Sequence, residues 1–304
     1  IPQDKMIKEK AHSKIAQLKL VIQNSGLNTS SIVHKEYNYE FDAIQDSKKI
    51  KVLLYFGKKG LKLVVQGDQK SSLYNLVNSL VNEQPTLALN EQKVDEPAAY
   101  IGTDEAGKGD IFGPLVIAAV YVNEGTKDEL YRIGVRDSKD LSDTQIDILA
   151  GKIKKLCKDH FSIVEFKPEL YNQTYTKYNN LNKLLSFGHS KAIKNLLDDI
   201  DAITVISDKF GNRGLEIHSD KSFSHVEFID TEKAERFVGV AAASILARNC
   251  FNQWFDKHEQ LGVLFPKGSS EKAQSFLKVF VKQNDPAQLK HFTKLHFKTI
   301  KQYL

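Results

Sequence analysis

The chain is most constrained by one apolar run, LVIAAVYV at residues 115–122. A strand that is apolar almost throughout is expected to be covered on both faces, as in a sheet between two layers of helices. The other predicted elements of this region are strands at 98–103, 161–166, 202–207 and 225–229 and helices at 142–157, 178–197, 231–254 and 270–281. Strands that alternate with helices in this way predict an α/β fold with a mixed sheet flanked by helices.

A smaller module precedes this sheet and has its own pattern. Its predicted elements are a helix at 7–21, strands at 37–42, 51–57 and 61–67, and an amphipathic helix at 73–81. The segment Lys58-Lys59-Gly60 separates two of the strands and suits a hairpin turn, because glycine tolerates positive φ. The residues after this module hold two prolines and no sustained period. We therefore expect an α+β domain over residues 1–84, a linker over 85–97 and a second domain over 98–304.

Positive charge is concentrated in the first module. Residues 1–90 contain 13 lysines, no arginine and 8 acidic residues, whereas the whole chain contains 43 basic and 38 acidic residues. The net charge of +5 therefore originates in this module. A lysine-rich module beside a neutral one favours a polyanion-binding function. A solvated lysine surface would explain the charge equally well.

The composition also favours a cytoplasmic protein. The apolar run at 115–122 is far shorter than the roughly 20 residues of a membrane helix, so we expect no membrane partner. The two cysteines, Cys157 and Cys250, lie far apart and match no metal-binding or redox spacing. A reducing cytoplasm is the simplest location for such a chain.

One motif points to chemistry, GTDEAGKG at residues 102–109. Its glycines and lysine resemble the phosphate-binding loop of nucleotide hydrolases, which needs a Ser or Thr after the lysine and then a helix. Here Gly109 stands in place of the hydroxyl, and the apolar strand follows in place of the helix. Asp104 and Glu105 would also repel a triphosphate. We therefore expect no nucleotide cofactor, and we interpret the two carboxylates as the functional groups.

Two further acids occupy comparable positions. Asp208 follows the predicted strand at 202–207, and Glu235 lies near the start of the predicted helix at 231–254. Acids at strand ends near a helix start suit Mg²⁺ or Mn²⁺, which prefer oxygen ligands. Two such ions would stabilise the attacking and leaving oxygens of phosphodiester cleavage. Taken singly, each acid also has a structural explanation, as a cap, a turn residue or a solvated helix residue.

The adjacency of Asp104 and Glu105 sets a geometric condition. Adjacent residues of a strand face opposite sides of the sheet. We therefore expect the strand to close at Asp104 and the chain to bend after it, so that both acids share one site. Gly107 and Gly109 permit such a bend and let a bulky polyanion approach the backbone.

Several ordered motifs resemble the type 2 ribonuclease H family. They are GTDEAGKGDIFGPLVIAAV at 102–120, RDSKDLS at 136–142, ISDKF at 206–210 and KAERFVGVAAASILAR at 233–248. Four shorter segments are similar to the ribonuclease HIII branch of that family: KAE at 233–235, PKGSS at 266–270, KLHFKT at 294–299 and VVQG at 64–67. The resemblance covers nearly the whole chain.

The resemblance implies a ribonuclease H-like fold with a mixed five-stranded sheet, and a TATA-binding-protein-like fold for the first module. It implies endonucleolytic cleavage of the RNA strand of RNA–DNA hybrids with Mg²⁺ or Mn²⁺, leaving 5′-phosphate and 3′-hydroxyl ends. The catalytic and metal-binding acids of the family correspond to Asp104, Glu105, Asp208 and Glu235, with Glu232 one turn from the last. The element that contacts the ribose 2′-hydroxyl corresponds to Gly107, Lys108 and Gly109.

Further residues are candidates for contact with the substrate. Ser244 either touches the substrate or packs within its helix, and His296 either assists the substrate or closes the core. We expect the first module to bind the hybrid through Lys58, Lys59 and Lys62 and through aromatic side chains of its sheet. The expected partner is thus an RNA–DNA hybrid, and the expected state is a monomer.

Two alternative functions stay open at this point. One is ribonuclease HII-like nicking at single ribonucleotides in duplex DNA, against which the basic first module and the KAE segment argue. The other is a non-catalytic hybrid-binding protein, which the presence of all four acids disfavours.

Overall fold

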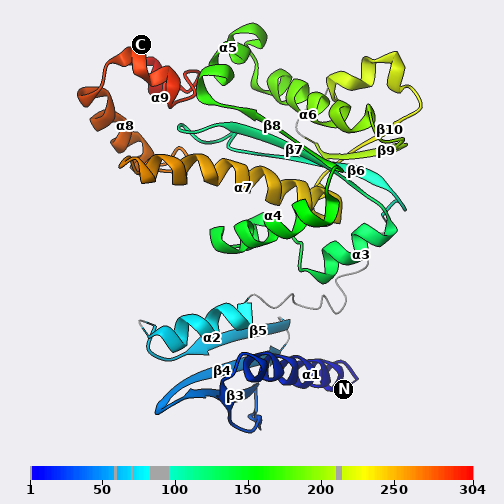
Figure 1. Cartoon of the computed structure of the whole chain (residues 1–304), viewed down its shortest axis with the longest axis vertical. Coiled ribbons are helices and arrows are strands. Elements are labelled where there is room, and N and C mark those ends of the chain that lie inside the picture. The colour runs from blue at the N-terminus through cyan, green and yellow to red at the C-terminus, as the bar shows by residue number, and fades with distance from the viewer. Residues whose placement is uncertain (1, 58–59, 70, 83–95, 210–213, 304) are drawn as a thin grey trace. The chain divides into compact units, whose positions relative to one another are not determined.

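The computed structural model (Figure 1) describes residues 2–57, 60–69, 71–82, 96–209 and 214–303. The chain divides into two compact units, residues 1–86 and 87–304, and each unit has its own hydrophobic core. Lys58 and Lys59 and most of the expected linker lie outside the described residues. None of the described helices is long and apolar enough to cross a membrane.

The first unit is an antiparallel sheet with two helices against one face. Its elements are α1 (Pro2–Asn24), β1 (Asn28–Thr29), β2 (Val33–His34), β3 (Asn38–Gln45), β4 (Lys48–Gly57), β5 (Gly60–Gln66) and α2 (Ser72–Asn82). The strand order is β1-β3-β4-β5, with β2 beside β3. Alternate residues of β4, such as Val52 and Leu54, are buried in a core shared with α1 and α2. The predicted helices and strands are confirmed, and Gly60 has the positive φ, 93°, of the predicted hairpin.

The second unit is built on a five-stranded mixed sheet. Its strands are β6 (Tyr100–Ala106), β7 (Leu115–Val122), β8 (Phe161–Phe166), β9 (Thr204–Asp208) and β10 (Glu227–Thr231). The strand order is β10-β9-β6-β7-β8. Strand β9 is parallel to both of its neighbours, whereas β7 is antiparallel to β6 and β8. The predicted mixed five-stranded sheet is therefore confirmed.

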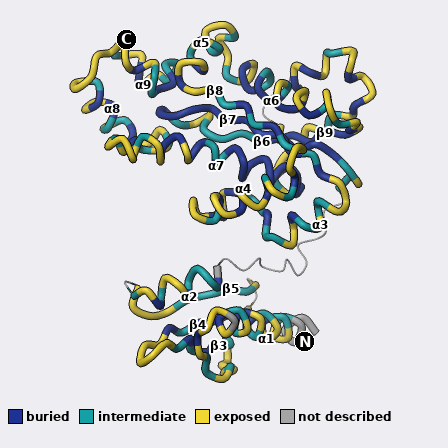
Figure 2. The backbone as a smooth tube through the Cα atoms, in the orientation of Figure 1, coloured by how far each residue is buried: buried dark blue, intermediate teal, exposed yellow. Residues whose placement is uncertain are grey.

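Helices cover both faces of this sheet (Figure 1). They are α3 (Glu124–Arg132), α4 (Asp143–Cys157), α5 (Pro168–Tyr178), α6 (Leu181–Leu197), α7 (Val238–Gln260), α8 (Glu271–Gln283) and α9 (Lys298–Lys301). The even-numbered residues of β7 from Val116 belong to the core that contains α4 and α7, and the odd-numbered residues from Leu115 belong to the core that contains α5 and α6. Two-sided burial thus explains the apolar run, which is dark along almost its whole length in Figure 2.

Two glycines bring α7 directly onto the backbone of β6. A Cβ atom at Gly102 would lie 2.3 Å from the Val240 nitrogen, and one at Gly239 would lie 2.7 Å from the Tyr100 ring. Neither position has room for a larger side chain. The first turns of α7 therefore lie against the strand that carries Asp104.

Two predicted helices have different boundaries in the structure. The helix predicted at 178–197 is α6, which begins only at Leu181, because Asn179 has a left-handed backbone, φ 45°, and the Asn180 side chain caps α6; the preceding helix α5 was not predicted. The helix predicted at 231–254 starts only at Val238. Before it, β10 ends at Thr231 and a 3₁₀ turn covers Ala234–Arg236, which follows Lys233 with φ 56°.

The expected end of β6 at Asp104 is also wrong. The strand continues through Glu105 to Ala106, because β7 pairs with it along its whole length. The bend expected after Asp104 is therefore absent, and the two acids are consecutive residues of a regular strand.

Candidate active site

The carboxyl ends of β6 and β9 bring two of the candidate acids together. The parallel pairing of these strands ends at Thr103 opposite Ser207, so Asp104 and Asp208 are the next residues on each side. Side chains that are level in neighbouring parallel strands point to the same face of the sheet. Asp104 and Asp208 therefore meet at one end of the sheet, as predicted from their positions after apolar strands.

Glu105 points to the opposite face from Asp104 because β6 remains regular. Ser244, on α7, is hydrogen-bonded to the Asp104 side chain. On the other face, Nε2 of His189, on α6, lies 3.1 Å from Oε2 of Glu105. The two adjacent acids are thus held by helices from two different layers.

His189 is a buried residue that the sequence did not single out. Its Nδ1 lies 2.9 Å from the Thr103 hydroxyl, whose own proton is directed at the Ala118 carbonyl, 2.8 Å away. The hydroxyl therefore accepts from Nδ1, while the Glu105 carboxylate accepts from Nε2. These contacts hold the imidazole, which is 1% exposed, between Thr103 and Glu105.

The pKa values of the two adjacent acids diverge. Burial and the nearby charge of Glu105 raise the pKa of Asp104 to about 7, against the hydrogen bond from Ser244. Burial also acts to raise the pKa of Glu105, but the hydrogen bond and charge of His189 and the charge of Lys108 outweigh it and lower that pKa. Glu105 is therefore ionised at neutral pH, whereas the Asp104 carboxyl is protonated in part of the molecules.

The Lys108 ammonium is the cation that these carboxylates share. Its Nζ lies 2.7 Å from Oε1 of Glu105. Burial acts to lower the pKa of Lys108, but the charges of Glu105, Asp104 and Asp208 outweigh it and raise the pKa. Three carboxylates thus act on one positive charge, which is the electrostatic environment that a divalent cation requires.

Glu235 is less exposed than Glu232, the other candidate for the fourth position. Glu235 lies in the 3₁₀ turn before α7, its side chain is 27% exposed, and it is 4.0 Å from Nζ of Lys139. Glu232 is exposed to solvent. Within the described ranges, no three His, Cys, Asp or Glu side chains are already spaced as ligands of a metal ion. All four groups are carboxylates, which suit Mg²⁺ or Mn²⁺, and three of them, Asp104, Glu105 and Asp208, act on the same Lys108 ammonium although Asp104 and Glu105 point to opposite faces of the sheet.

Ser244 is turned inward, which favours the second of its two interpretations, a residue that packs within the protein. It is 7% exposed, and its Oγ lies 2.8 Å from Oγ of Ser138. The carbonyl of Ser138 accepts a 2.7 Å hydrogen bond from Arg248. The two hydroxyls therefore form a buried support for Asp104, and Ser138, the first serine of RDSKDLS, is a site residue that sequence reasoning did not assign.

The two glycines that flank Lys108 are in different environments. Gly107 has φ 87°, and a Cβ atom there would lie 2.3 Å from the Pro114 carbonyl and 2.7 Å from the Phe251 ring. Only glycine fits this position. A Cβ atom at Gly109 would meet nothing within 4 Å, and the residue is exposed. The backbone at Gly109 is therefore open to a ligand.

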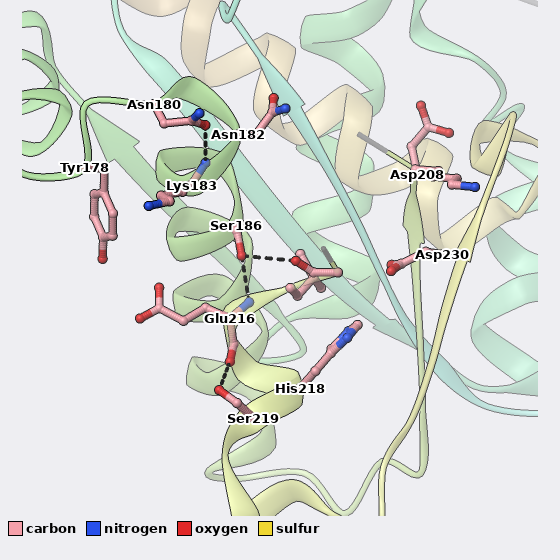
Figure 3. A pocket seen from close by; sticks show the side chains of 13 residues that line it. Tyr178, Asn180, Asn182, Lys183, Ser186, Asp208, Glu216, His218, Ser219 and Asp230 are labelled. Carbon is pink, nitrogen blue, oxygen red and sulfur yellow. Dashed lines mark hydrogen bonds between the residues drawn. The ribbon is translucent and has the colours of Figure 1, made fainter. Parts of the chain in front are cut away.

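A depression of about 930 Å³ opens beside Asp208 (Figure 3). Its described lining residues are Tyr178, Asn180, Asn182, Lys183, Ser186, Asp208, Lys209, Gly214, Leu215, Glu216, His218, Ser219 and Asp230. Of the four candidate acids, Asp208 is the one in this lining. The depression therefore adjoins the carboxylate site and offers amide and ammonium groups on its far side.

The structure also describes the surroundings of two other predicted site features. In the first unit, Lys62 is exposed and level with Tyr55 across β4 and β5, on the face away from the core. Lys58 and Lys59 lie outside the described residues. His296 packs against Tyr175, with ring centroids 4.5 Å apart, and burial lowers its pKa to about 4. That placement agrees with the interpretation of His296 as a core residue.

Comparisons with known proteins agree on one family. The sequence matches the family described as Ribonuclease HII over residues 101–300. Ribonuclease HIII of Protochlamydia amoebophila is 37% identical over 259 residues, which are 80% of this chain and 83% of that protein. Ribonuclease HIII of Chlamydia pneumoniae is 40% identical over 204 residues, which are 66% of this chain and 68% of that protein.

Solved structures show the same likeness. The crystal structure of Aquifex aeolicus RNase H3 aligns with a TM-score of 0.53 at 28% identity, over 94% of this chain and 97% of that one. The crystal structure of Bst-RNase HIII in complex with Mn²⁺ aligns with a TM-score of 0.60 at 23% identity, over 90% and 92% of the two chains. The fold, the motifs and the sequence relatives agree, and this chain belongs to the type 2 ribonuclease H family, in its ribonuclease HIII branch.

Proposed function

We propose that this protein is an endonuclease that hydrolyses the RNA strand of RNA–DNA hybrids. The observation that carries the proposal is the meeting of Asp104 and Asp208 at neighbouring strand ends, with Glu105 and the Gly107–Gly109 loop beside them. The membership of the ribonuclease HIII branch supports the same reaction. We also propose that the protein acts as a cytoplasmic monomer without a nucleotide cofactor.

Divalent cations are proposed to bind at the four acids. Asp104, Glu105, Asp208 and Glu235 would hold two Mg²⁺ or Mn²⁺ ions, and the related Bst-RNase HIII was crystallised with Mn²⁺. Such ions, when bound, supply an activated water and charge stabilisation of the departing 3′ oxygen, which yields 5′-phosphate and 3′-hydroxyl ends.

The side chains around the acids are proposed to prepare the site before substrate arrives. His189 holds the Glu105 carboxylate, and the Ser138–Ser244 pair holds that of Asp104. Lys108 occupies the shared negative field of Asp104, Glu105 and Asp208. Its side chain is 52% exposed, so it would be able to turn from Glu105 toward a substrate phosphate if the acids held metal ions.

Recognition of RNA is proposed to depend on the loop at 107–109. The 2′-hydroxyl is the group that separates a ribose from a deoxyribose at a given site. The open surface at Gly109 lets a ribose approach the backbone amides, and Lys108 carries the charge for the adjacent phosphate. The first unit would add affinity through Lys62 and Tyr55, with Lys58 and Lys59 beside them in sequence.

A cleavage assay on two substrates tests the proposal. One substrate is a uniform RNA–DNA hybrid, and the other is duplex DNA with a single ribonucleotide, each tested with Mg²⁺ and with Mn²⁺. We expect cleavage of the hybrid at many positions and little cleavage of the second substrate. Comparable cleavage of both would favour the ribonuclease HII-like alternative, and hybrid binding without cleavage would favour the non-catalytic one.

A further inference from the structure

The support of the Gly107–Gly109 loop by distant residues leads to an inference that rests on the proposed function. The loop continues through Asp110–Gly113 before β7 begins. Each end of this continuation is hydrogen-bonded to the C-terminal part of the chain: Ile111 N to Gly268 O at 3.1 Å, Gly113 N to Phe292 O at 3.0 Å, and Lys294 N to Ile111 O at 2.9 Å. The loop is therefore supported from a segment that is remote in sequence.

Lys294 lies at the centre of this support and is unusual for a lysine. Its side chain is fully buried, and its Nζ donates to Asp110 O at 3.0 Å and to Gly113 O at 2.7 Å. The ring of Tyr171 covers the amino group at 5.6 Å. Its hydrogen-bond acceptors are backbone carbonyls and not carboxylates, and burial lowers the pKa of Lys294 to about 7, against the charge of Asp110.

A buried lysine lowers the stability of the fold, so we look for its function in the backbone geometry that its amino group fixes. Burying an amino group away from water is unfavourable unless hydrogen bonds compensate. The two carbonyls that Lys294 joins belong to residues at the start and the end of the turn. Joining them fixes the width of the turn, whether the amino group is charged or neutral, since both forms donate two hydrogen bonds.

The Asp110–Gly113 turn, once clamped, fixes the position of the Gly107 backbone. The carbonyl of Pro114, one residue beyond the clamp, is the atom against which the Gly107 backbone rests. Gly113 itself lies against Phe255 of α7. A shift of Asp110 or Gly113 would therefore move the backbone that precedes Lys108 and Gly109.

We infer that Lys294 is a positioning residue, whose amino group clamps the Asp110–Gly113 turn so that the Gly107–Gly109 backbone is set for contact with the ribose of the RNA strand. Lys294 does not touch the substrate in this role. Misplacement of a binding group by about 1 Å is sufficient to reduce a rate by a large factor. The loss of the clamp should therefore appear in the discrimination of RNA from DNA as well as in the stability of the fold.

The test compares Lys294→Met with Thr293→Val in the full chain. Methionine keeps the length and removes both donors, whereas Thr293 is equally buried and its hydroxyl donates to Leu289 O, within its own segment. Affinities for a hybrid and for duplex DNA of the same sequence are measured without added metal, so that no cleavage occurs, and kcat and KM are then measured with Mg²⁺. We expect the preference for the hybrid to fall about tenfold in Lys294→Met and to change less than about twofold in Thr293→Val.

The outcomes separate this inference from the proposed function. An unchanged hybrid preference in Lys294→Met would overturn the positioning role, while a wild-type protein without hybrid preference or cleavage would overturn the proposed function itself. If Lys294→Met does not fold, Lys294→Gln, which keeps a shorter donor, is compared in its place. A partial loss of hybrid preference in Lys294→Gln then supports the clamp, and full preference in that variant contradicts it. Rapid amide exchange at Ile111 and Gly113 in the wild type would contradict it as well.

Discussion

The two glycines beside Lys108 give a matched pair of substitutions that separates the fold from the function. Gly107→Ala places a Cβ atom 2.3 Å from the Pro114 carbonyl and 2.7 Å from the Phe251 ring, at a residue with φ 87°. Gly109→Ala places the same atom in open space. The two changes are chemically identical and two residues apart, so a difference between them reports the local environment.

The magnitude for Gly107→Ala follows from two terms. A left-handed backbone costs a residue with a Cβ atom about 1–2 kcal/mol. The overlap with a carbonyl and an aromatic ring costs about 1–3 kcal/mol more. The sum is about 2–5 kcal/mol, and each kcal/mol lowers Tm by about 2–4 °C in a domain of this size. We therefore expect Tm to fall by about 4–20 °C.

Gly109→Ala should show the opposite combination of effects. Its free energy of unfolding should change by less than about 0.5 kcal/mol, because nothing lies near the new methyl group. Hybrid cleavage should nevertheless weaken about tenfold in kcat/KM, because the methyl group occupies the surface that the ribose approaches. The assays are thermal unfolding by circular dichroism and steady-state cleavage of a labelled hybrid. Equal Tm values for both variants would refute the steric reasoning, and unchanged cleavage by Gly109→Ala would refute the role of its open surface.

Three further predictions concern titration and the buried supports of the acids. Burial and Glu105 raise the pKa of Asp104 to about 7, so protons compete with metal below that pH, and Mn²⁺ affinity measured by calorimetry should fall roughly tenfold from pH 8 to pH 6. Burial lowers the pKa of Lys294 to about 7, so the unfolded chain binds more protons than the folded one above that pH. The free energy of unfolding should therefore rise by as much as about 2 kcal/mol from pH 7 to pH 8.5 in urea titrations, and this rise should be absent in Lys294→Met. His189→Gln should lower Mn²⁺ affinity or kcat by about 10–100-fold with little change in KM, since the imidazole holds Glu105, and wild-type values would contradict that support.

The sheet was predictable from the sequence because its signals are local. The apolar run at 115–122 specifies a strand covered on both faces, and acids that follow two apolar strands are expected at one end of a sheet. Both expectations are met, and they locate Asp104 beside Asp208. The start of α6 was predicted three residues too early because Asn179 adopts a left-handed backbone without a glycine to signal it.

The remaining parts of the site depend on contacts between layers that no local pattern encodes. The bend after Asp104 was expected from two glycines, but pairing with β7 keeps the strand regular through Ala106. His189 reaches Glu105 only because α6 packs on that face of the sheet. Lysines are almost never fully buried, so the burial of Lys294 had no counterpart in the sequence pattern.

The most direct test of the central claim is metal-dependent cleavage of a uniform RNA–DNA hybrid by Asp104→Asn and Asp208→Asn, with Asp230→Asn as the matched control. Asp230 lines the same depression as Asp208, and its carboxylate accepts a 2.6 Å hydrogen bond from Ser207 that an asparagine oxygen can also accept. We predict that the first two variants lose cleavage by at least about a thousandfold with both Mg²⁺ and Mn²⁺, while the control stays within about tenfold of the wild type. Wild-type cleavage by Asp104→Asn would contradict the assignment of this carboxylate site as the one that cuts RNA.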